Sequence, residues 1–196
     1  MFLPALIGYF LGAIPTANLL ASLVGIDLRT QGSGNPGTNN ALRLGGPGLA
    51  ASVLLTEMAK GATATLIGGE LNGDPGMVIA GLAAVTGNLY NIFYRFKGGK
   101  GLGISAGVLF VAWPTVVIPA IAVIALAAWI TQSSDGATVI AIFSLSVMAG
   151  IWILAELPTG WGIENDRLLL ALGVGLGLLI WPKHQSNVRF KRPSPA

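Results

Sequence analysis

The sequence contains no cysteine among its 196 residues. That absence excludes disulfide bonds, a cysteine nucleophile and metal sites built on thiolates. Charge is also scarce, because charged residues make up 10% of the chain, where a soluble domain carries about a quarter. Histidine occurs once, and no pair of acidic residues has the arrangement of metal ligands. The sequence therefore predicts neither a metal site nor a cofactor.

Long apolar runs make up most of the chain. Hydrophobic residues account for 53% of the sequence, and the mean hydropathy is +0.73. Runs long enough to cross a bilayer recur along the chain. They occupy about 2–24, 48–68, 76–96, 102–130, 137–157 and 167–181. This pattern predicts an all-α, polytopic membrane protein with a single membrane domain over residues 1–196.

Basic residues gather in short clusters between the apolar runs. They follow the first, the third and the last run, whereas the loop after the second run holds only acidic side chains. By the positive-inside rule, the three basic regions lie in the cytoplasm and the amino terminus lies outside. The net charge of +3 then reflects membrane orientation, and it does not indicate a nucleic-acid partner.

The run at 102–130 decides the number of helices. It contains Pro114 and Pro119, and proline disrupts a helix interior. A single crossing would place the basic tail outside, whereas two crossings place it in the cytoplasm. Two helices of about 14 residues would each span about 21 Å at 1.5 Å per residue, so they must be short or shielded by protein. The sequence predicts seven membrane helices, two of them short, with a cytoplasmic carboxy terminus.

Three polar clusters lie on the predicted cytoplasmic face, and the first is GSGNPGTNNALR at 32–43. Its glycines allow successive backbone N–H groups to point toward one position, an arrangement that binds anions. Polar side chains add donors, and the arginine offers a planar fork suited to phosphate. The candidates are Ser33, Gly34, Asn35, Gly37, Asn40 and Arg43. A flexible turn with an orienting arginine is the alternative interpretation.

The second cluster is KGGKGLG at 97–103. It does not fit the nucleotide-binding pattern GxxxxGK[ST], because Tyr94 stands at the first glycine and Gly101 follows the lysine. A glycine-rich loop with two lysines remains, leading into a helix whose amino terminus also favours anions. The candidates are Lys97, Gly98, Gly99, Lys100 and Gly101, with Ser105 as possible support. A basic cluster that contacts lipid headgroups is the alternative.

The third cluster is KHQSNVRFKR at 183–192, and it contains the single histidine, His184. If the last helix continues, His184 and Asn187 lie three residues apart on one face, with Arg189 following. The spacing excludes the HxxxxD motif found in one class of acyltransferases, because position 189 is arginine. A lone histidine near a membrane surface is commonly structural, so both a structural and a catalytic role stay open.

Two ionisable residues, Glu57 and Lys60, lie well inside the second apolar run. Charges at membrane depth are costly, and they usually pair with each other or line a polar cavity. Mutual pairing is the simpler interpretation. It is also compatible with support of a nearby site.

Together, the three clusters resemble the motifs of the bacterial PlsY family, the acyl-phosphate:glycerol-3-phosphate acyltransferases. GSGNPGTNNALR, FKGGKG and HQSNVR stand in the order and at the spacing of that family, over nearly the whole chain. The resemblance implies seven helices in the bacterial inner membrane, with the motifs facing the cytoplasm. It implies transfer of a fatty acyl group from acyl phosphate to the 1-hydroxyl of glycerol 3-phosphate. The products are lysophosphatidic acid and phosphate, in the first step of phospholipid synthesis.

The resemblance also implies roles. By motif position, Ser33, Arg43, His184 and Asn187 would be catalytic, and the other cluster candidates would bind substrate. Cationic side chains would hold phosphate, and amide donors would stabilise the oxyanion on the attacked carbonyl. His184 would orient or deprotonate the acceptor hydroxyl, or the substrate's own phosphate would take that proton. The implied partners are the two substrates, the lipid bilayer and an acyl-phosphate-forming enzyme.

The chain departs from the family pattern at positions that we expect to lie behind the main donors. Asn39 and Ile104 each replace a threonine, and Glu57 replaces an aspartate. Asn88 and Asn91 stand where the family has histidine and proline, and no acidic residue closes the tail. Because the main donors all remain, we expect an active enzyme, and the sequence leaves open whether these departures alter its preference for donor or acceptor.

Two other functions fit the same clusters. A transporter or channel for a small phosphorylated anion could use such loops, and the prolines at 102–130 suit a broken helix. No paired, pseudo-symmetric halves support that function. A non-catalytic paralogue could also keep the phosphate sites. Phosphate release that requires both substrates separates the enzyme from both alternatives.

Overall fold

The computed structural model describes residues 1–184, and every regular element within them is a helix. The elements are α1 (Phe2–Ala13), α2 (Thr16–Ser22), α3 (Thr38–Leu89), η1 (Ile92–Tyr94), α4 (Leu102–Ala112), η2 (Pro114–Val116), α5 (Val117–Thr131), α6 (Ser134–Leu154) and α7 (Asp166–His184). Five helical stretches of the described part are long and apolar enough to cross a membrane, and α4 is a shorter apolar helix. The predicted all-α fold is confirmed for these residues.

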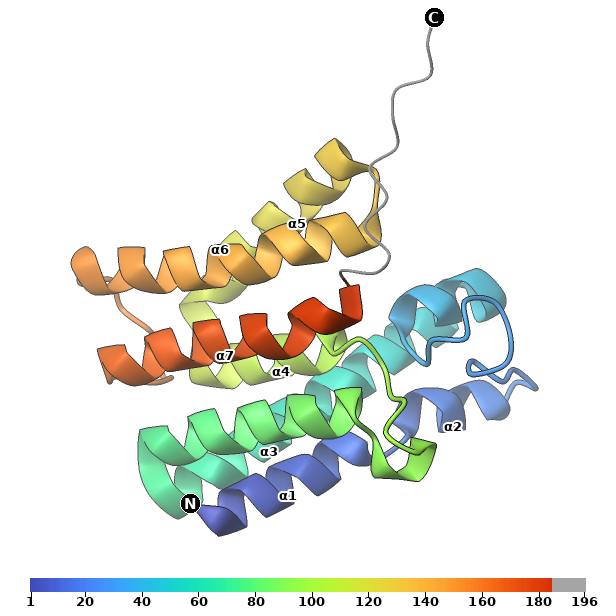
Figure 1. Cartoon of the computed structure of the whole chain (residues 1–196), viewed down its shortest axis with the longest axis horizontal. Coiled ribbons are helices and arrows are strands. Elements are labelled where there is room, and N and C mark those ends of the chain that lie inside the picture. Colours follow the sequence, from blue (N-terminus) through green and yellow to red (C-terminus); the bar gives the residue numbers. More distant parts are fainter. Residues whose placement is uncertain (185–196) are drawn as a thin grey trace, which may run out of the picture.

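Although α3 extends over 52 residues, it is not one straight helix. The backbone leaves the helical conformation at Asn72 and Gly73, and the two halves lie side by side in Figure 1. A side chain at Gly76 would overlap the carbonyl oxygen of Gly68, so the halves approach as closely as their backbones allow. A further non-helical residue, Gly46, separates the first turns of α3 from the long helix.

The run at 102–130 contains two helices, α4 and α5, as predicted. Trp113 has an extended φ of −152°, and Pro114 begins the turn that leads into α5. Pro119 lies in the first turn of α5, where proline is tolerated. The 11 residues of α4 span about 16 Å. Most of them are buried, and Gly107 lies so close to α3 that a side chain there would overlap its backbone.

The loops that carry the polar clusters lie at one end of the molecule (Figure 1). The α2–α3 loop, the α3–α4 segment, the α5–α6 turn and the last turn of α7 all lie at that end, on the right of the view. The turn within α3 and the α6–α7 connection lie at the opposite end. There the carboxylate of Asp74 accepts the backbone N–H groups of Glu164 and Asn165. We call the first region the cluster end.

Two groups of buried apolar residues hold the helices together. The larger one joins α3, α4, α6 and α7 and includes Trp113 and Leu172. The smaller one packs α2 and the α2–α3 loop against α3, with Leu28 and Val53 at its centre, so it sets the position of the first polar loop. Many large apolar side chains point outward, among them Ile118 at 79% exposure. Such an apolar surface suits lipid and not water.

Candidate functional site

The first polar cluster folds into a loop that is organised by one asparagine. Asn40 is buried, and its Nδ2 donates to the carbonyl oxygens of Leu28 and Gln31, each at 3.0 Å. Its Oδ1 accepts the backbone N–H of Ser33 at 2.9 Å. Gly32 has a φ of 61° and packs directly on Asn40, a position that a side chain could not occupy. Both amide hydrogens of Asn40 are used inside the loop. We predicted that Asn40 would donate to substrate, but in the structure it shapes the loop instead.

The backbone N–H groups of this loop are also largely used internally. The N–H of Gly34 donates to Gln31 O at 3.1 Å, and that of Gly37 donates to Asn35 O at 2.9 Å. These two amides therefore do not form the anion-binding nest that the glycines predicted. The loop offers side chains instead.

The side chains that the first cluster leaves accessible include Ser33 and Arg43. Ser33 is exposed in the loop, and Arg43 is exposed on the second turn of α3. Asn39, four residues before Arg43, is exposed on the same face of that helix. Asn39 was expected behind the donors, but it lies among them because α3 begins at Thr38. Asn35 is half-buried.

The second cluster is held against the end of α3 by its glycines. The N–H of Gly98 donates to Leu89 O at 3.1 Å, and that of Gly99 donates to Asn88 O at 3.0 Å. A side chain at Gly98 would overlap Asn88 O, so this approach requires glycine. Gly101 has a φ of 86° and is the N-cap of α4. The amides of Gly98 and Gly99 thus fix the loop and are not free for phosphate, contrary to prediction.

The first two clusters meet around a small polar cavity. Its volume is about 10 Å³, enough for about one water molecule. Pro36 of the first cluster and Gly99 of the second line it, together with Glu57 and Asn88. Tyr94 also lines the cavity, and the guanidinium of Arg29 lies 4.1 Å from its ring centroid, which links the same two loops.

Glu57 and Lys60 pair with each other, as the simpler interpretation predicted. Lys60 Nζ lies 2.9 Å from Glu57 Oε1, and the two residues are 7% and 6% exposed. Lys60 also donates to the carbonyl oxygens of Gly12 and Ile14, and Glu57 accepts the hydroxyl of Thr16 at 2.7 Å. Through these contacts the pair holds the connection between α1 and α2 in place. Both residues also line the small polar cavity.

Two departures from the family pattern contact each other. Asn88 Nδ2 donates to Glu57 Oε2 at 2.7 Å. Asn91 Nδ2 donates to Ala13 O at 2.7 Å, and its Oδ1 accepts the N–H of Phe93. These three side chains are buried beneath the loops, as expected for them. The substitutions are thus accommodated by hydrogen bonds that the new side chains make.

Positions 104 and 105 lie in the first turn of α4. Ile104 is buried, and its carbonyl packs against Gly61 of α3. Ser105 is also buried, and its hydroxyl has no hydrogen-bond partner within the described residues. Ser105 can therefore support the site only from inside the helix packing.

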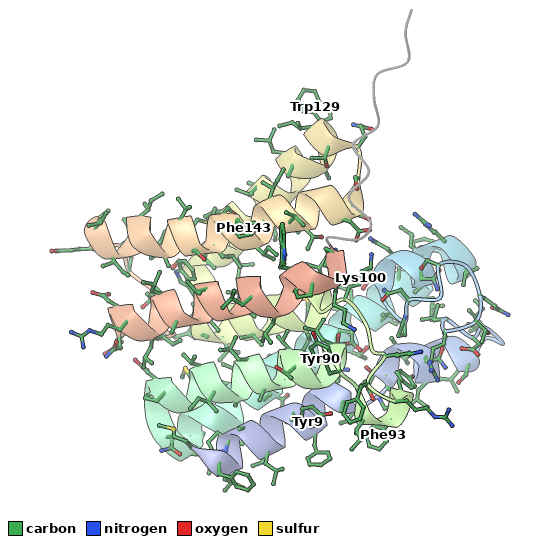
Figure 2. The ribbon with its side chains drawn as sticks, in the orientation of Figure 1. Tyr9, Tyr90, Phe93, Lys100, Trp129 and Phe143 are labelled. Atoms are coloured by element: carbon green, nitrogen blue, oxygen red, sulfur yellow. The ribbon has the colours of Figure 1, made fainter. Side chains whose placement is uncertain are left out.

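His184 of the third cluster ends α7 and is 1% exposed. Its Nδ1 lies 2.7 Å from Asp135 Oδ1, and its Nε2 lies 3.4 Å from Lys100 O. The ammonium of Lys100 lies 2.5 Å from the same oxygen of Asp135. Figure 2 shows Lys100 beside the carboxy-terminal end of α7. The second and third clusters therefore meet, whereas Asn187 and Arg189 lie outside the described residues.

Asp135 has no part in the sequence-based predictions. It stands in the first turn of α6, where a carboxylate favours the positive end of the helix. Ser133 caps the same turn by accepting the N–H of Gly136. Both features indicate a helix start, and only the packing of α6 against α7 brings this carboxylate to His184.

Cationic side chains surround the loops at the cluster end. Arg43 and Lys97 are exposed and Lys100 is half-exposed. Asp27 lies in the same region, where the backbone N–H of Arg29 and a neighbouring hydroxyl lower the pKa of its carboxyl below the usual value. At neutral pH that carboxylate is ionised, and it already accepts hydrogen bonds from Arg29 and Thr30. The described residues hold no group of three or more potential metal ligands. The exposed cations suit a phosphate-bearing ligand.

Sequence comparison also points to a phosphate-bearing substrate. Residues 2–191 match the protein family described as "Glycerol-3-phosphate acyltransferase". The glycerol-3-phosphate acyltransferase of Agrobacterium fabrum is 39% identical over 189 residues, which cover 95% of this chain and 86% of that protein. The one of Symbiobacterium thermophilum is 36% identical over 189 residues, which cover 94% and 87%.

The fold is similar to two crystal structures of PlsY (YgiH), an integral membrane glycerol 3-phosphate acyltransferase. One is its glycerol 3-phosphate form and the other its lysophosphatidic acid form. Each has a TM-score of 0.79 and 28% sequence identity, and each match covers 95% of this chain and 89% of that one. The protein is an integral, multi-pass membrane protein, and it belongs to the PlsY-type glycerol-3-phosphate acyltransferase family.

Proposed function

We propose that the protein transfers a fatty acyl group from acyl phosphate to the 1-hydroxyl of glycerol 3-phosphate, giving lysophosphatidic acid and phosphate. The observation that carries this proposal is the meeting of the first two clusters with His184 of the third at one end of the bundle, where Arg43 and Lys97 are exposed. Donor and acceptor each bear a phosphate, and guanidinium and ammonium groups bind phosphate well. Family membership supports the same reaction.

In this reaction the acceptor hydroxyl oxygen attacks the carbonyl carbon of acyl phosphate. A new ester C–O bond forms, and the C–O bond to phosphate then breaks. Arg43 and Lys97, both exposed, hold the phosphates and offset the charge on the leaving group. The hydroxyl of Ser33 donates toward the developing oxyanion. The proton of the acceptor goes to the leaving phosphate or to Nε2 of His184, and these two routes differ in what His184→Ala should do.

The acyl chain would lie in an apolar groove along α1. This groove has a volume of about 450 Å³ and is lined by Leu6, Ile7, Phe10, Leu11, Ile14 and Phe93. Ile14 also lines the small polar cavity between the first two clusters. Ile14 thus borders both the apolar groove and the polar cavity. An acyl phosphate needs such a junction, because its chain is apolar and its phosphate is charged.

We also propose that the chain crosses the membrane seven times. The crossings would be α1 with α2, the two halves of α3, and then α4, α5, α6 and α7. The cluster end would face the cytoplasm of the bacterial inner membrane, because its loops hold the basic residues. Cysteine labelling tests this orientation, because the natural chain has no cysteine. Single cysteines at Gln31 and Asn72 should react from opposite sides.

Phosphate release by the purified protein in lipid tests the reaction. Palmitoyl phosphate and glycerol 3-phosphate are the substrates, and Arg43→Ala is the key variant. We expect release that requires the acceptor and falls at least 100-fold in Arg43→Ala. Folded protein that releases no phosphate in the presence of both substrates would overturn the proposal. A large loss in His184→Ala would favour this residue as the base, and a small one would favour the substrate phosphate.

A further inference from the structure

A single carboxylate oxygen joins Lys100 to His184. Asp135 Oδ1 lies 2.5 Å from Lys100 Nζ and 2.7 Å from His184 Nδ1. The three residues come from the α3–α4 segment, the first turn of α6 and the last turn of α7. The side chains of His184, Asp135 and Lys100 are 2%, 14% and 28% exposed, respectively. The imidazole is therefore enclosed, while part of the Lys100 side chain reaches the surface.

We propose that Asp135 is a positioning residue for acyl transfer, which fixes the tautomer of His184 and holds the ammonium of Lys100 beside it. The inference rests on the proposed function, because it gives Asp135 a task within that reaction. Asp135 acts through its two neighbours and does not itself touch the substrate.

The hydrogen-bond chemistry of the carboxylate selects one form of the ring. An ionised carboxylate accepts hydrogen bonds and donates none, so the ring nitrogen beside it must carry a hydrogen. Neutral imidazole has only one such hydrogen, and Asp135 places it on Nδ1 of His184. Nε2 is then left with its lone pair. Its distance of 3.4 Å from Lys100 O is longer than a good hydrogen bond, and that oxygen offers no hydrogen to it.

The same carboxylate orients Lys100 without using up its binding capacity. An ammonium has three hydrogens, and the bond to Asp135 uses one of them. The other two make no hydrogen bond to a side chain or backbone group within residues 1–184, and they would bind a phosphate at the half-exposed side of the residue. Loss of Asp135 would release a long, flexible side chain, and ordering it again on phosphate would cost conformational entropy.

Nitrogen NMR tests the tautomer independently of activity. His184 is the single histidine of the chain, so a protein purified without a histidine tag gives one imidazole spectrum that needs no assignment. In neutral imidazole of the wild-type protein, we expect Nδ1 to be protonated and Nε2 to be unprotonated. Asp135→Ala should lose this preference and Asp135→Glu should largely keep it. An unchanged Nδ1–H form in Asp135→Ala would overturn the inference.

Kinetics test whether Asp135 acts through its neighbours. Asp135→Ala should lower kcat at least tenfold, and in a His184→Ala/Lys100→Ala background, which lacks both neighbours, it should cost less than threefold more. Independent losses that multiply in the triple variant would contradict a positioning role. Asp166→Ala is the matched control, because Asp166 also stands in the first turn of a helix but at the opposite end of the bundle. It should leave kcat unchanged.

Two precautions keep the outcomes distinct. If Asp135→Ala does not fold, Asp135→Asn retains the shape of the side chain and removes its charge. It should still lower kcat, because a neutral amide binds the ammonium of Lys100 less strongly. If the wild-type protein transfers no acyl group, the proposed function fails, whereas the NMR result still decides whether Asp135 sets the tautomer.

Discussion

Lys60 of α3 donates to the carbonyl oxygen of Ile14 at 2.8 Å and pairs with Glu57 at 2.9 Å. One buried ammonium thus neutralises a carboxylate and satisfies the backbone where α1 ends. Removing one member of a buried ion pair leaves the other charge uncompensated, which costs about 3 to 5 kcal/mol.

The first prediction follows from this pair. Lys60→Met should lower the unfolding midpoint markedly, because Glu57 loses its countercharge and the carbonyl groups of Gly12 and Ile14 lose the ammonium as a donor. The double variant Glu57→Gln/Lys60→Met should recover part of the loss. Thermal unfolding in detergent measures both. Lys97→Met is the control, since Lys97 is exposed and should leave the midpoint unchanged. Equal midpoints for Lys60→Met and the control would refute the structural role.

A second prediction concerns Gly98. Gly98→Ala should lower acyl transfer at least 100-fold, because the added methyl group overlaps the carbonyl oxygen of Asn88 and displaces the lysine loop. Gly150→Ala provides the comparison, since nothing lies within 4 Å of the added carbon there. In the interior of α6 it should be neutral, or stabilise by about 0.5 to 1 kcal/mol. Activity and unfolding midpoints measured side by side separate the two. Full activity in Gly98→Ala would mean that the loop does not need this contact.

A third prediction concerns the organising role of Asn40. Asn40→Ala should expose the α2–α3 loop to hydrogen exchange, because three hydrogen bonds within the loop are lost. Each buried group left without a partner costs about 1 to 3 kcal/mol. Asn39→Ala, at the exposed neighbouring position, should leave exchange of the loop unchanged. Hydrogen exchange followed by mass spectrometry reports on residues 28–37 directly. Similar protection in both variants would show that Asn40 does not hold the loop.

The fourth prediction tests the apolar groove. Ile14→Trp should narrow the junction between the groove and the polar cavity, so activity with palmitoyl phosphate should fall at least tenfold. Activity with a short-chain acyl phosphate should fall much less. Leu3→Trp, at an exposed position of α1 that does not line the groove, should have little effect on activity with either donor. A uniform loss for all chain lengths in Ile14→Trp would place the acyl chain elsewhere.

Local signals in the sequence predicted the helices and the loops between them. Pro114 predicted the break between α4 and α5, because proline cannot continue a helix interior. The pairing of Glu57 with Lys60 was also predictable, since both charges lie in an apolar run and stand three residues apart. The ion pair rests on residues close in sequence, whereas the prediction of two helices at 102–130 also rested on the positions of the basic loops.

Contacts between distant segments were not predictable in the same way. Asn40 has the composition of a ligand-binding residue, but the packing of α2 against α3 turns it inward. Gly98 reads as part of a phosphate loop, yet its N–H bonds to Leu89. From the sequence, Asp135 looks only like an acidic residue in the first turn of a helix. Its contacts to Lys100 and His184 could not be predicted, because they cross 35 and 49 residues of chain.

The bonds from Gly98 and Gly99 to the last carbonyl groups of α3 have a consequence for substrate binding. They end the helix and hold the loop with the same two contacts, so the lysine loop is ordered before any ligand arrives. A preorganised loop loses little conformational entropy when it binds, and more of the contact energy then appears as affinity. Selectivity at this loop would therefore depend on how well a substrate fits the shape that the loop already has, and not on a conformational change that the substrate induces.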